Sequence, residues 1–353
     1  MNRSPGDSTR IGLVGLGGIG KAVTRLLLEH RHGHEIVMAA TKESGDIGRP
    51  LHEVAESGSE HGGPPVTDDI EKVLAEKPDV VVLATGSFLS DTLDDVLACA
   101  SAGVDLISPC EELAFPFHRF PEQARQIDQA ARRGGATILG TGVNPGFVFD
   151  GLLIAATGVS WDVESIRGRR VVDVSGFGEN IHLRLGIGYT EAEFEQGHET
   201  GEIAGHVGFP ESIEMVAERL GVTLDGPVEE RFEPMIAETD APTGYGGVAK
   251  GKTEGFVQRA VGKMNGKDWI QFELLLHLRP RAAGFEPADN IEIAGIHPVH
   301  LTLSPGMDAI PATSAQLVNS IPVVLAAEPG LRSVKDLPIG AAWLGAPRGD
   351  LLR

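Results

Sequence analysis

Hydrophobic residues in the first 140 positions form short unbroken runs, separated by longer stretches in which they recur at helical spacing. The strands expected from these runs are residues 11–14, 36–40, 79–84, 105–108 and 137–140. Such runs are typical of strands that are buried on both faces of a parallel sheet. Helical spacing is found in residues 20–29, 91–102 and 121–133. The alternation therefore predicts an α/β fold with a Rossmann-type, doubly wound parallel sheet.

Beyond residue 144, strand-like segments follow one another with fewer helices between them. They are residues 165–174, 182–185, 270–278 and 291–294. One helix is expected to begin at Pro210, a favourable first-turn residue, and to end at Gly221. This pattern predicts an α+β second domain with an open mixed sheet.

The length of 353 residues exceeds what one hydrophobic core needs. We expect a first domain over residues 1–145 and a second over 146–311. Residues 312–324 show helical spacing again, so 312–353 is expected to be a C-terminal helix and tail that return to the first domain.

Composition and charge exclude several functions. The formal net charge of −20 would repel nucleic acid. Cys99 and Cys110 are too few for a disulfide framework or a cysteine-based zinc site. His297 and His300 lack a third ligand at suitable spacing, so no metal site is expected. The N-terminus has no apolar leader and no apolar run approaches the ~20 residues that span a bilayer, which predicts a cytoplasmic protein without a membrane partner.

A glycine-rich loop follows the first predicted strand. The sequence Gly-Leu-Gly-Gly-Ile-Gly, which begins at Gly15, matches the G-x-G-x-x-G pattern and leads into a predicted helix. Gly15 would permit a tight turn, Gly17 would let the backbone approach a diphosphate, and Gly20 would let helix and strand pack closely. Gly18 and Ile19 lie at the helix N-terminus, whose free N–H groups favour phosphate. The first domain is therefore expected to bind a dinucleotide, and the second to hold the substrate and an oligomer contact.

The end of the second predicted strand bears on which dinucleotide is bound. An NAD site usually has an acidic residue there for the ribose hydroxyls, whereas a 2′-phosphate requires a cation. Thr41 and Lys42 follow Ala40, and Arg49 lies nearby in the sequence. A hydroxyl and a lysine suit NADP. The alternative is NAD, with Lys42 exposed to solvent and Glu43 contacting the ribose.

Two further loops are expected at the same edge of the sheet. Thr85 and Ser87 follow the strand at 79–84 and would contact the ribose or the nicotinamide, although ordinary turn chemistry explains them as well. Glu111 and Glu112 follow the strand at 105–108. A carboxylate there could exchange a proton beside the nicotinamide, or both acids could cap a helix. Only one of the two glutamates is expected to face the substrate, and we expect it to be Glu111 because it lies nearer the strand end.

A resemblance to a known family rests on three motifs. C-E-E-L-A-F-P at 110–116 and G-T-G-V-N-P-G-F at 140–147 follow the glycine loop. Together they resemble the NAD(P)-dependent amine dehydrogenases, a family that includes 2,4-diaminopentanoate dehydrogenase and is dihydrodipicolinate-reductase-like. The resemblance implies that Glu111 or its neighbour handles the reacting proton. It also implies that Asn144 lies near the nicotinamide, and Phe147 and Val148 near the substrate.

The reaction that the resemblance implies is reductive amination. A ketone or aldehyde would condense with ammonia, the iminium would take a hydride, and oxidative deamination would be the reverse. The sequence departs from the relatives that use diaminopentanoate because it has no acid at the end of the second strand, where Thr41 and Lys42 stand. This departure favours NADP and puts a diamino acid substrate in doubt.

Weaker signals and rival functions accompany this interpretation. His206 precedes the helix at Pro210 and could reach the substrate, or it could be an ordinary loop histidine. Arg169 and Arg170 could hold a carboxylate, but an edge-strand surface position is the simpler expectation. The rivals are a dihydrodipicolinate-reductase-like reductase of C=N, C=C or carbonyl groups, and a non-catalytic NADPH sensor. A homodimer through the open sheet is expected.

Overall fold

The computed structural model describes residues 8–59, 63–203, 205–244 and 246–344. The chain forms two compact units. Unit 1 comprises Met1–Phe147 and Ala309–Arg353, and unit 2 comprises Val148–Asp308. Among the described residues, no helix combines the length and the apolar character that crossing a bilayer requires.

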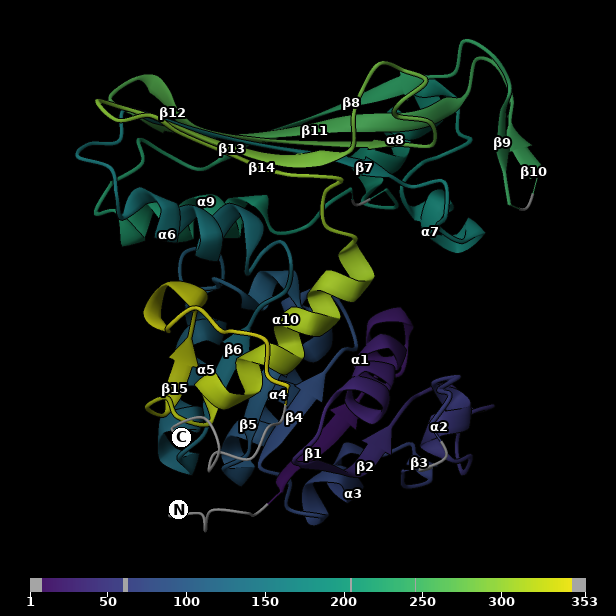
Figure 1. The fold of residues 1–353 in the computed structure, drawn as a ribbon, viewed down its shortest axis with the longest axis vertical. Helices are drawn as coiled ribbons and strands as arrows, with labels where there is room; N and C mark the ends of the chain where they lie inside the picture. The colour runs from purple at the N-terminus through teal and green to yellow at the C-terminus, as the bar shows by residue number, and fades with distance from the viewer. Residues whose placement is uncertain (1–7, 60–62, 204, 245, 345–353) are drawn as a thin grey trace. The chain divides into compact units, whose positions relative to one another are not determined.

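Unit 1 is built on a seven-stranded sheet in which every pairing is parallel. Its strands are β1 (Thr9–Val14), β2 (His34–Ala40), β3 (Val66–Thr67), β4 (Val80–Leu83), β5 (Asp105–Ser108), β6 (Thr137–Gly140) and β15 (Gly330–Arg332). Their order is β15-β6-β5-β4-β1-β2-β3 (Figure 1). The order reverses between β1 and β4, which is the switch point where such sheets bind ligands. The predicted Rossmann-type sheet is confirmed.

Helices cover both faces of this sheet. They are α1 (Gly18–His30), α2 (Leu51–Val54), α3 (Ile70–Ala75), α4 (Leu89–Ala102), α5 (Pro121–Gly134) and α10 (Ala309–Val324), with short 3₁₀ turns η1 (Glu111–Leu113) and η3 (Val334–Asp336). Val81 of β4 is buried in a cluster with α4 and α5, whereas its neighbour Val82 is buried in another with α1 and α10. Consecutive apolar residues are needed because each strand packs on two layers.

Turn and cap residues set the helix ends as their chemistry predicts. Pro121 opens α5, and Gly135 ends it with a φ of 81°. Gly103 ends α4 with a φ of 73°. Both glycines adopt the left-handed conformation that other residues rarely take.

Unit 2 is built on a six-stranded mixed sheet of order β14-β13-β7-β12-β11-β8. Its strands are β7 (Ser165–Asp173), β8 (Glu229–Ile236), β11 (Thr253–Met264), β12 (Lys267–His277), β13 (Ala288–Ala294) and β14 (Val299–Leu303). Only the β7–β12 pairing of this sheet is parallel. A separate hairpin contains β9 (Ala241–Thr243) and β10 (Gly246–Val248). The predicted mixed sheet is confirmed.

The helices of unit 2 are associated with one face of the large sheet. They are the π-helical turn η2 (Val148–Leu152), α6 (Leu153–Thr157), α7 (Glu179–Arg184), α8 (Glu191–Thr200) and α9 (Phe209–Arg219). Figure 1 shows α6 and α9 under this sheet. The rings of Phe149, Phe209 and Phe272 pack together there, with Phe149 and Phe272 stacked at 4.6 Å.

Two expectations for unit 2 are wrong. Residues 182–185 are the end of α7 and the residue after it, not a strand. Their alternation of polar and apolar residues is too short to distinguish the two, and the buried His182 contacts the Val174 carbonyl through Nε2 at 2.7 Å. Arg169 and Arg170 lie in β7, which pairs with β12 and β13, so the expected edge position is wrong. Arg170 is also buried, whereas Arg169 is exposed as expected.

Candidate cofactor and active site

The glycine loop contains two glycines that the fold itself requires. Gly15 follows β1 with a φ of 88°, and its N–H donates to the Ala40 carbonyl at 2.9 Å. A Cβ at Gly15 would overlap the Ala84 carbonyl oxygen, and a Cβ at Gly20 would overlap the Gly15 carbonyl oxygen. Larger residues would therefore separate α1 from the strand ends.

Gly17 differs because no contact with the described residues requires a glycine at this position. Its φ is −73°, which other residues adopt readily, and a Cβ there would meet no atom within 4 Å. Gly17 is the N-cap of α1, and no side chain caps this helix end. Gly18 and Ile19 form the first turn, where backbone N–H groups favour an anion. Open space at a glycine beside a helix N-terminus fits the diphosphate of a nicotinamide dinucleotide.

The loop after β2 holds the residues expected to distinguish the two cofactors. Thr41 is buried, and its N–H donates to the Thr67 carbonyl at 2.9 Å. Its Oγ1 accepts the Glu43 N–H at 3.3 Å, which fixes the turn. Lys42 is exposed. Burial raises the pKa of Asp95 on α4, and the positive charge of Lys42 partly opposes that shift.

Arg49, the other cation of this segment, is already paired. Its guanidinium lies 2.8 Å from Asp46 and 4.0 Å from Glu53. Within the described ranges, Lys42 forms no ion pair. Lys42 is therefore better placed than Arg49 to meet a 2′-phosphate.

The loop after β4 is joined to the turn after β5. Thr85 is exposed and Ser87 half-buried. The Ser87 carbonyl accepts the Cys110 thiol at 3.3 Å and the Glu112 N–H at 3.4 Å. Burial raises the pKa of the Cys110 thiol to about 12, so this cysteine stays protonated and is not a nucleophile.

The two adjacent glutamates have different surroundings. Glu112 is buried, and its carboxylate accepts the Leu89 N–H at 2.7 Å, at the first residue of α4. It therefore caps a helix N-terminus, where negative charge is favourable. Glu111 is the first residue of η1 and remains half-buried. The capping alternative thus applies to Glu112.

The turn after β6 carries Asn144. The Thr141 N–H donates to the Ser108 carbonyl at 2.8 Å, which ties this turn to the end of β5. Gly146 has a φ of 134°, and a Cβ there would overlap the Gly142 backbone. Asn144 is buried in this tightly wound turn.

The predicted residues of unit 1 lie at one edge of the sheet. Thr41, Gly15, Thr85, Glu111 and Asn144 follow the carboxyl ends of β2, β1, β4, β5 and β6, and these strands are neighbours in the sheet. This edge is where open α/β sheets bind ligands. The exposed Lys42 and the half-buried Ser87 lie on the same loops.

The predicted substrate residues are divided between the units. Phe147 is half-buried at the end of unit 1, whereas Val148 is fully buried in η2 of unit 2. His206 lies in unit 2 before α9, and its ring meets Phe209 edge-on at 4.7 Å. The amide of Gln258 accepts the His206 N–H and donates to the His206 carbonyl, both at 2.8 Å. Burial lowers the pKa of His206 to about 3, and the positive charge of Arg170 adds to this shift.

A buried ion pair in unit 2 was missed from the sequence. Arg170 lies 3.0 Å from Asp289, and both side chains are buried. Arg170 donates to the Met307 carbonyl at 2.9 Å, and Asp289 accepts the Met307 N–H at 2.9 Å. A separation of more than a hundred residues leaves no local signal for this pairing.

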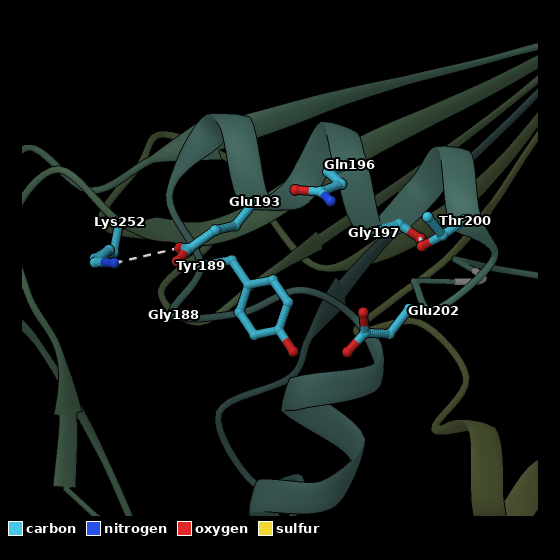
Figure 2. Close-up of a pocket in the computed structure, with 8 residues that line it drawn as sticks. All are labelled: Gly188, Tyr189, Glu193, Gln196, Gly197, Thr200, Glu202 and Lys252. Carbon is cyan, nitrogen blue, oxygen red and sulfur yellow. Dashed lines mark hydrogen bonds and ion pairs between the residues drawn. The ribbon is translucent and has the colours of Figure 1, made fainter.

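Unit 2 also contains a polar pocket of about 530 Å³. It is lined by Gly188, Tyr189, Glu193, Gln196, Gly197, Thr200, Glu202 and Lys252 (Figure 2). The Glu193 carboxylate accepts the Thr190 N–H at 2.7 Å and lies 3.5 Å from Lys252. None of the predicted site residues lines this pocket. Over the described ranges, no cluster of His, Cys, Asp and Glu could hold a metal ion.

Comparison with protein families gives a match over the second half of the chain. The model of the 2,4-diaminopentanoate dehydrogenase C-terminal domain matches residues 147–351. Among curated proteins, a 2,4-diaminopentanoate dehydrogenase of Acetoanaerobium sticklandii is 33% identical over 340 residues, covering 96% of each chain. An amine dehydrogenase of Streptomyces virginiae is 25% identical over 350 residues, covering 93% of this chain and 96% of its own.

Among solved structures, an amine dehydrogenase from Mycobacterium smegmatis has a similar fold. Its TM-score is 0.84 at 24% identity, covering 97% of this chain and all of its own. At that level of identity the likeness concerns the fold. It agrees with the two sheets described above.

Proposed function

Since this chain belongs to the 2,4-diaminopentanoate dehydrogenase family and is an oxidoreductase of CH–NH₂ groups, we propose that it is an NADP(H)-dependent amine dehydrogenase. It would catalyse the reductive amination of a ketone or aldehyde with ammonia, and the reverse deamination. A nicotinamide cofactor follows from the family and the fold. The preference for NADP and the use of free ammonia are the new parts of this proposal.

One observation carries the proposal. A half-buried carboxylate, Glu111, follows β5 at the same sheet edge as the open space beside Gly17. Its neighbour Glu112 caps α4, so we assign the proton chemistry of this turn to Glu111.

Glu111 would manage the protons of the reaction. Its carboxylate takes a proton from ammonium, and the ammonia released attacks the substrate carbonyl carbon. A proton moves from the added nitrogen to the former carbonyl oxygen, which gives a carbinolamine. The Glu111 carboxylic acid then donates its proton to the carbinolamine hydroxyl, so that water leaves and an iminium remains. When bound, the cofactor supplies the hydride that converts this iminium to the amine. Asn144, in its tightly wound turn, would hold the nicotinamide amide.

The loop after β2 supports NADP. Lys42 is exposed and forms no ion pair within the described ranges. The neighbouring Thr41 is buried, and its hydroxyl oxygen accepts the Glu43 N–H while its O–H can donate. A 2′-phosphate would receive charge-assisted hydrogen bonds from these groups. The two positions directly after β2 are Thr41 and Lys42, so neither carries a negative charge that would repel this phosphate.

The reaction is tested by following NADPH oxidation with a panel of ketones and aldehydes, with and without ammonium. We expect oxidation that requires carbonyl and ammonium together. Glu111→Gln should lower this rate at least about 100-fold, the scale of general acid–base catalysis. The matched control Glu112→Gln should stay within a few-fold of wild type, because its amide oxygen can still accept the Leu89 N–H.

Two results would contradict the proposal. Carbonyl reduction that ignores ammonium would indicate an alcohol-forming reductase of the dihydrodipicolinate-reductase-like kind. Tight NADPH binding without oxidation by any carbonyl would indicate a non-catalytic sensor.

We also propose a homodimer formed through the open face of the unit 2 sheet. Gly168 of β7 faces Phe149 on the helix side, so Arg169 faces the other way. On that open face, Glu233, Arg259, Glu273 and Arg169 form an ion-pair row across β8, β11, β12 and β7. Alternating charges of this kind can complement a second copy about a two-fold axis.

The size of the sheet suits such a contact. Six strands spaced about 4.8 Å apart, each rising about 3.3 Å per residue, present roughly 800 Å². A standard interface buries about 800 Å² per partner. An apolar cluster of Val171, Val257 and Leu275, with Met235 and Phe285, adjoins the charged row.

A further inference from the structure

The C-terminal helix α10 contacts both loops that the proposed cofactor site requires in unit 1. Ile310 Cδ1 lies 3.8 Å from where a Cβ of Gly18 would be, at the start of α1. One turn later, Thr313 Oγ1 accepts the Val143 N–H at 3.2 Å. Gln316 Nε2 then donates to Thr141 Oγ1 at 3.4 Å. A single helix thus meets the glycine loop and the turn that carries Asn144.

The turn after β6 has few side chains and backbone N–H groups that could stabilise its conformation. Residues 140–146 include three glycines and Pro145, so they offer few side chains for packing and one backbone position without an N–H. Val143 is buried, and its N–H would lose its acceptor without the Thr313 hydroxyl. A buried N–H without an acceptor is unfavourable, so this turn depends on α10 for its conformation.

Helix α10 is itself held in place by packing against α1. Leu317, Val318 and Ile321 of α10 are fully buried in one cluster with Val23 and Leu27 of α1. Figure 1 shows α10 beside α1. Because α1 begins at the glycine loop, the same packed pair of helices fixes the diphosphate side of the site and the Asn144 side.

We propose that Thr313 is a positioning residue for the nicotinamide cofactor. It holds the backbone of Val143 and thereby sets the place of the Asn144 amide, and Gln316 supports it through Thr141. This assignment rests on the proposed function only in that the cofactor binds at this edge of the sheet. It makes the segment after residue 308 a component of the cofactor site.

The test compares two substitutions of one side chain. Thr313→Val keeps the branched shape but removes the acceptor, whereas Thr313→Ser keeps the hydroxyl. We expect Thr313→Val to raise the Kd for NADPH about tenfold and to lower kcat about tenfold, the scale of one lost hydrogen bond to a buried group. Thr313→Ser should stay within about twofold of wild type. Kd is measured by NADPH fluorescence titration without any amine or carbonyl.

A control and a second variant separate positioning from general stability. Ser320→Ala removes a buried hydroxyl of the same helix that donates to the Gln316 carbonyl at 2.7 Å. It should change Tm as much as Thr313→Val does, with the Kd unchanged. Gln316→Leu should raise the Kd in the same direction, by a few-fold, and serves if Thr313→Val fails to fold.

The outcomes distinguish this assignment from the proposed reaction. Wild-type Kd and kcat in Thr313→Val, or equal damage in Thr313→Ser, would overturn it while the enzyme remained an amine dehydrogenase. Wild-type Kd in Gln316→Leu would overturn it if Thr313→Val did not fold. A wild type that binds neither NADPH nor NADH would contradict the proposed function and this assignment together.

Discussion

At the scale of single residues, adjacent glutamates on one turn serve different purposes. Successive residues of a 3₁₀ turn point about 120° apart, so Glu111 and Glu112 cannot face the same surroundings. Glu112 reaches the Leu89 N–H across 23 positions of sequence. The sequence allowed either role for either acid, because that contact depends on where β4 and β5 lie in the sheet.

The proposed preference for NADPH over NADH depends on the Lys42 side chain. Lys42→Ala should raise the KM for NADPH about tenfold and leave the KM for NADH unchanged, because only the 2′-phosphate loses its charge-assisted contact. Arg49→Ala is the matched control, since Arg49 is already paired with Asp46. Steady-state kinetics with both cofactors decide the matter. A wild-type preference for NADH that Lys42→Ala leaves unaltered would contradict the NADP proposal.

His206 makes stability depend on pH. Burial and the charge of Arg170 lower its pKa to about 3, below the ordinary value. The unfolded chain therefore takes up a proton below about pH 6.5 that the folded chain does not, and stability falls as pH falls from there toward 3. Between pH 7 and 5, the free energy of unfolding of His206→Asn should fall by about 1–2 kcal/mol less than that of the wild type. Urea unfolding at the two pH values measures this difference. Parallel pH profiles for the two proteins would exclude this shift.

At the scale of elements, the loop between β1 and α1 contains one glycine that the packing requires and one that the proposed ligand requires. Gly20→Ala should destabilise unit 1 by about 1–3 kcal/mol, because its Cβ would overlap the Gly15 carbonyl. The methyl group of Gly17→Ala would meet no atom of the described residues within 4 Å, so the free energy of unfolding of this variant should match wild type. Its Kd for NADPH should nevertheless rise at least about tenfold, since the methyl group would occupy the diphosphate space. Urea unfolding and NADPH titration of both variants check the pair, and unchanged NADPH binding in Gly17→Ala would contradict the site.

The elements differ in how well periodicity revealed them. β5 and β6 were predicted to the residue, because short apolar runs ended by turn residues define a strand buried on both faces. β3 and β15 span two and three residues and leave no periodic signal. The expected strand at 182–185 is part of a short helical segment because four residues of alternating polarity fit both structures. The helix expected over residues 312–324 begins three residues earlier, at Ala309, and ends at Val324 as expected.

At the scale of the whole molecule, the charged row on the open face predicts how copies assemble. Glu273 pairs with Arg169 and with Arg259, at 2.7 and 2.8 Å. Glu273→Lys would leave several adjacent positive charges, which would repel a second copy. We expect the wild type to be a dimer and Glu273→Lys to be a monomer, as measured by light scattering or analytical ultracentrifugation. Glu122→Lys, at an exposed ion pair on α5, should leave the dimer intact.

A different result would exclude this interface. A wild type that is monomeric at micromolar concentration would argue against any stable dimer. A Glu273→Lys variant that remains dimeric would place the contact on another surface.

The sequence by itself determined the alternation of strands and helices, the glycine loop and the order of motifs along one sheet edge. These follow from local periodicity and from short-range sterics, which act between residues that are close in the chain. Tertiary structure decided which glutamate caps α4, why Gly17 has open space and which helix holds the turn at Asn144. Each of these depends on a contact or a gap between distant segments, as between Thr313 and Val143, 170 positions apart. Packing of the whole sheet had to place those segments before such contacts could form.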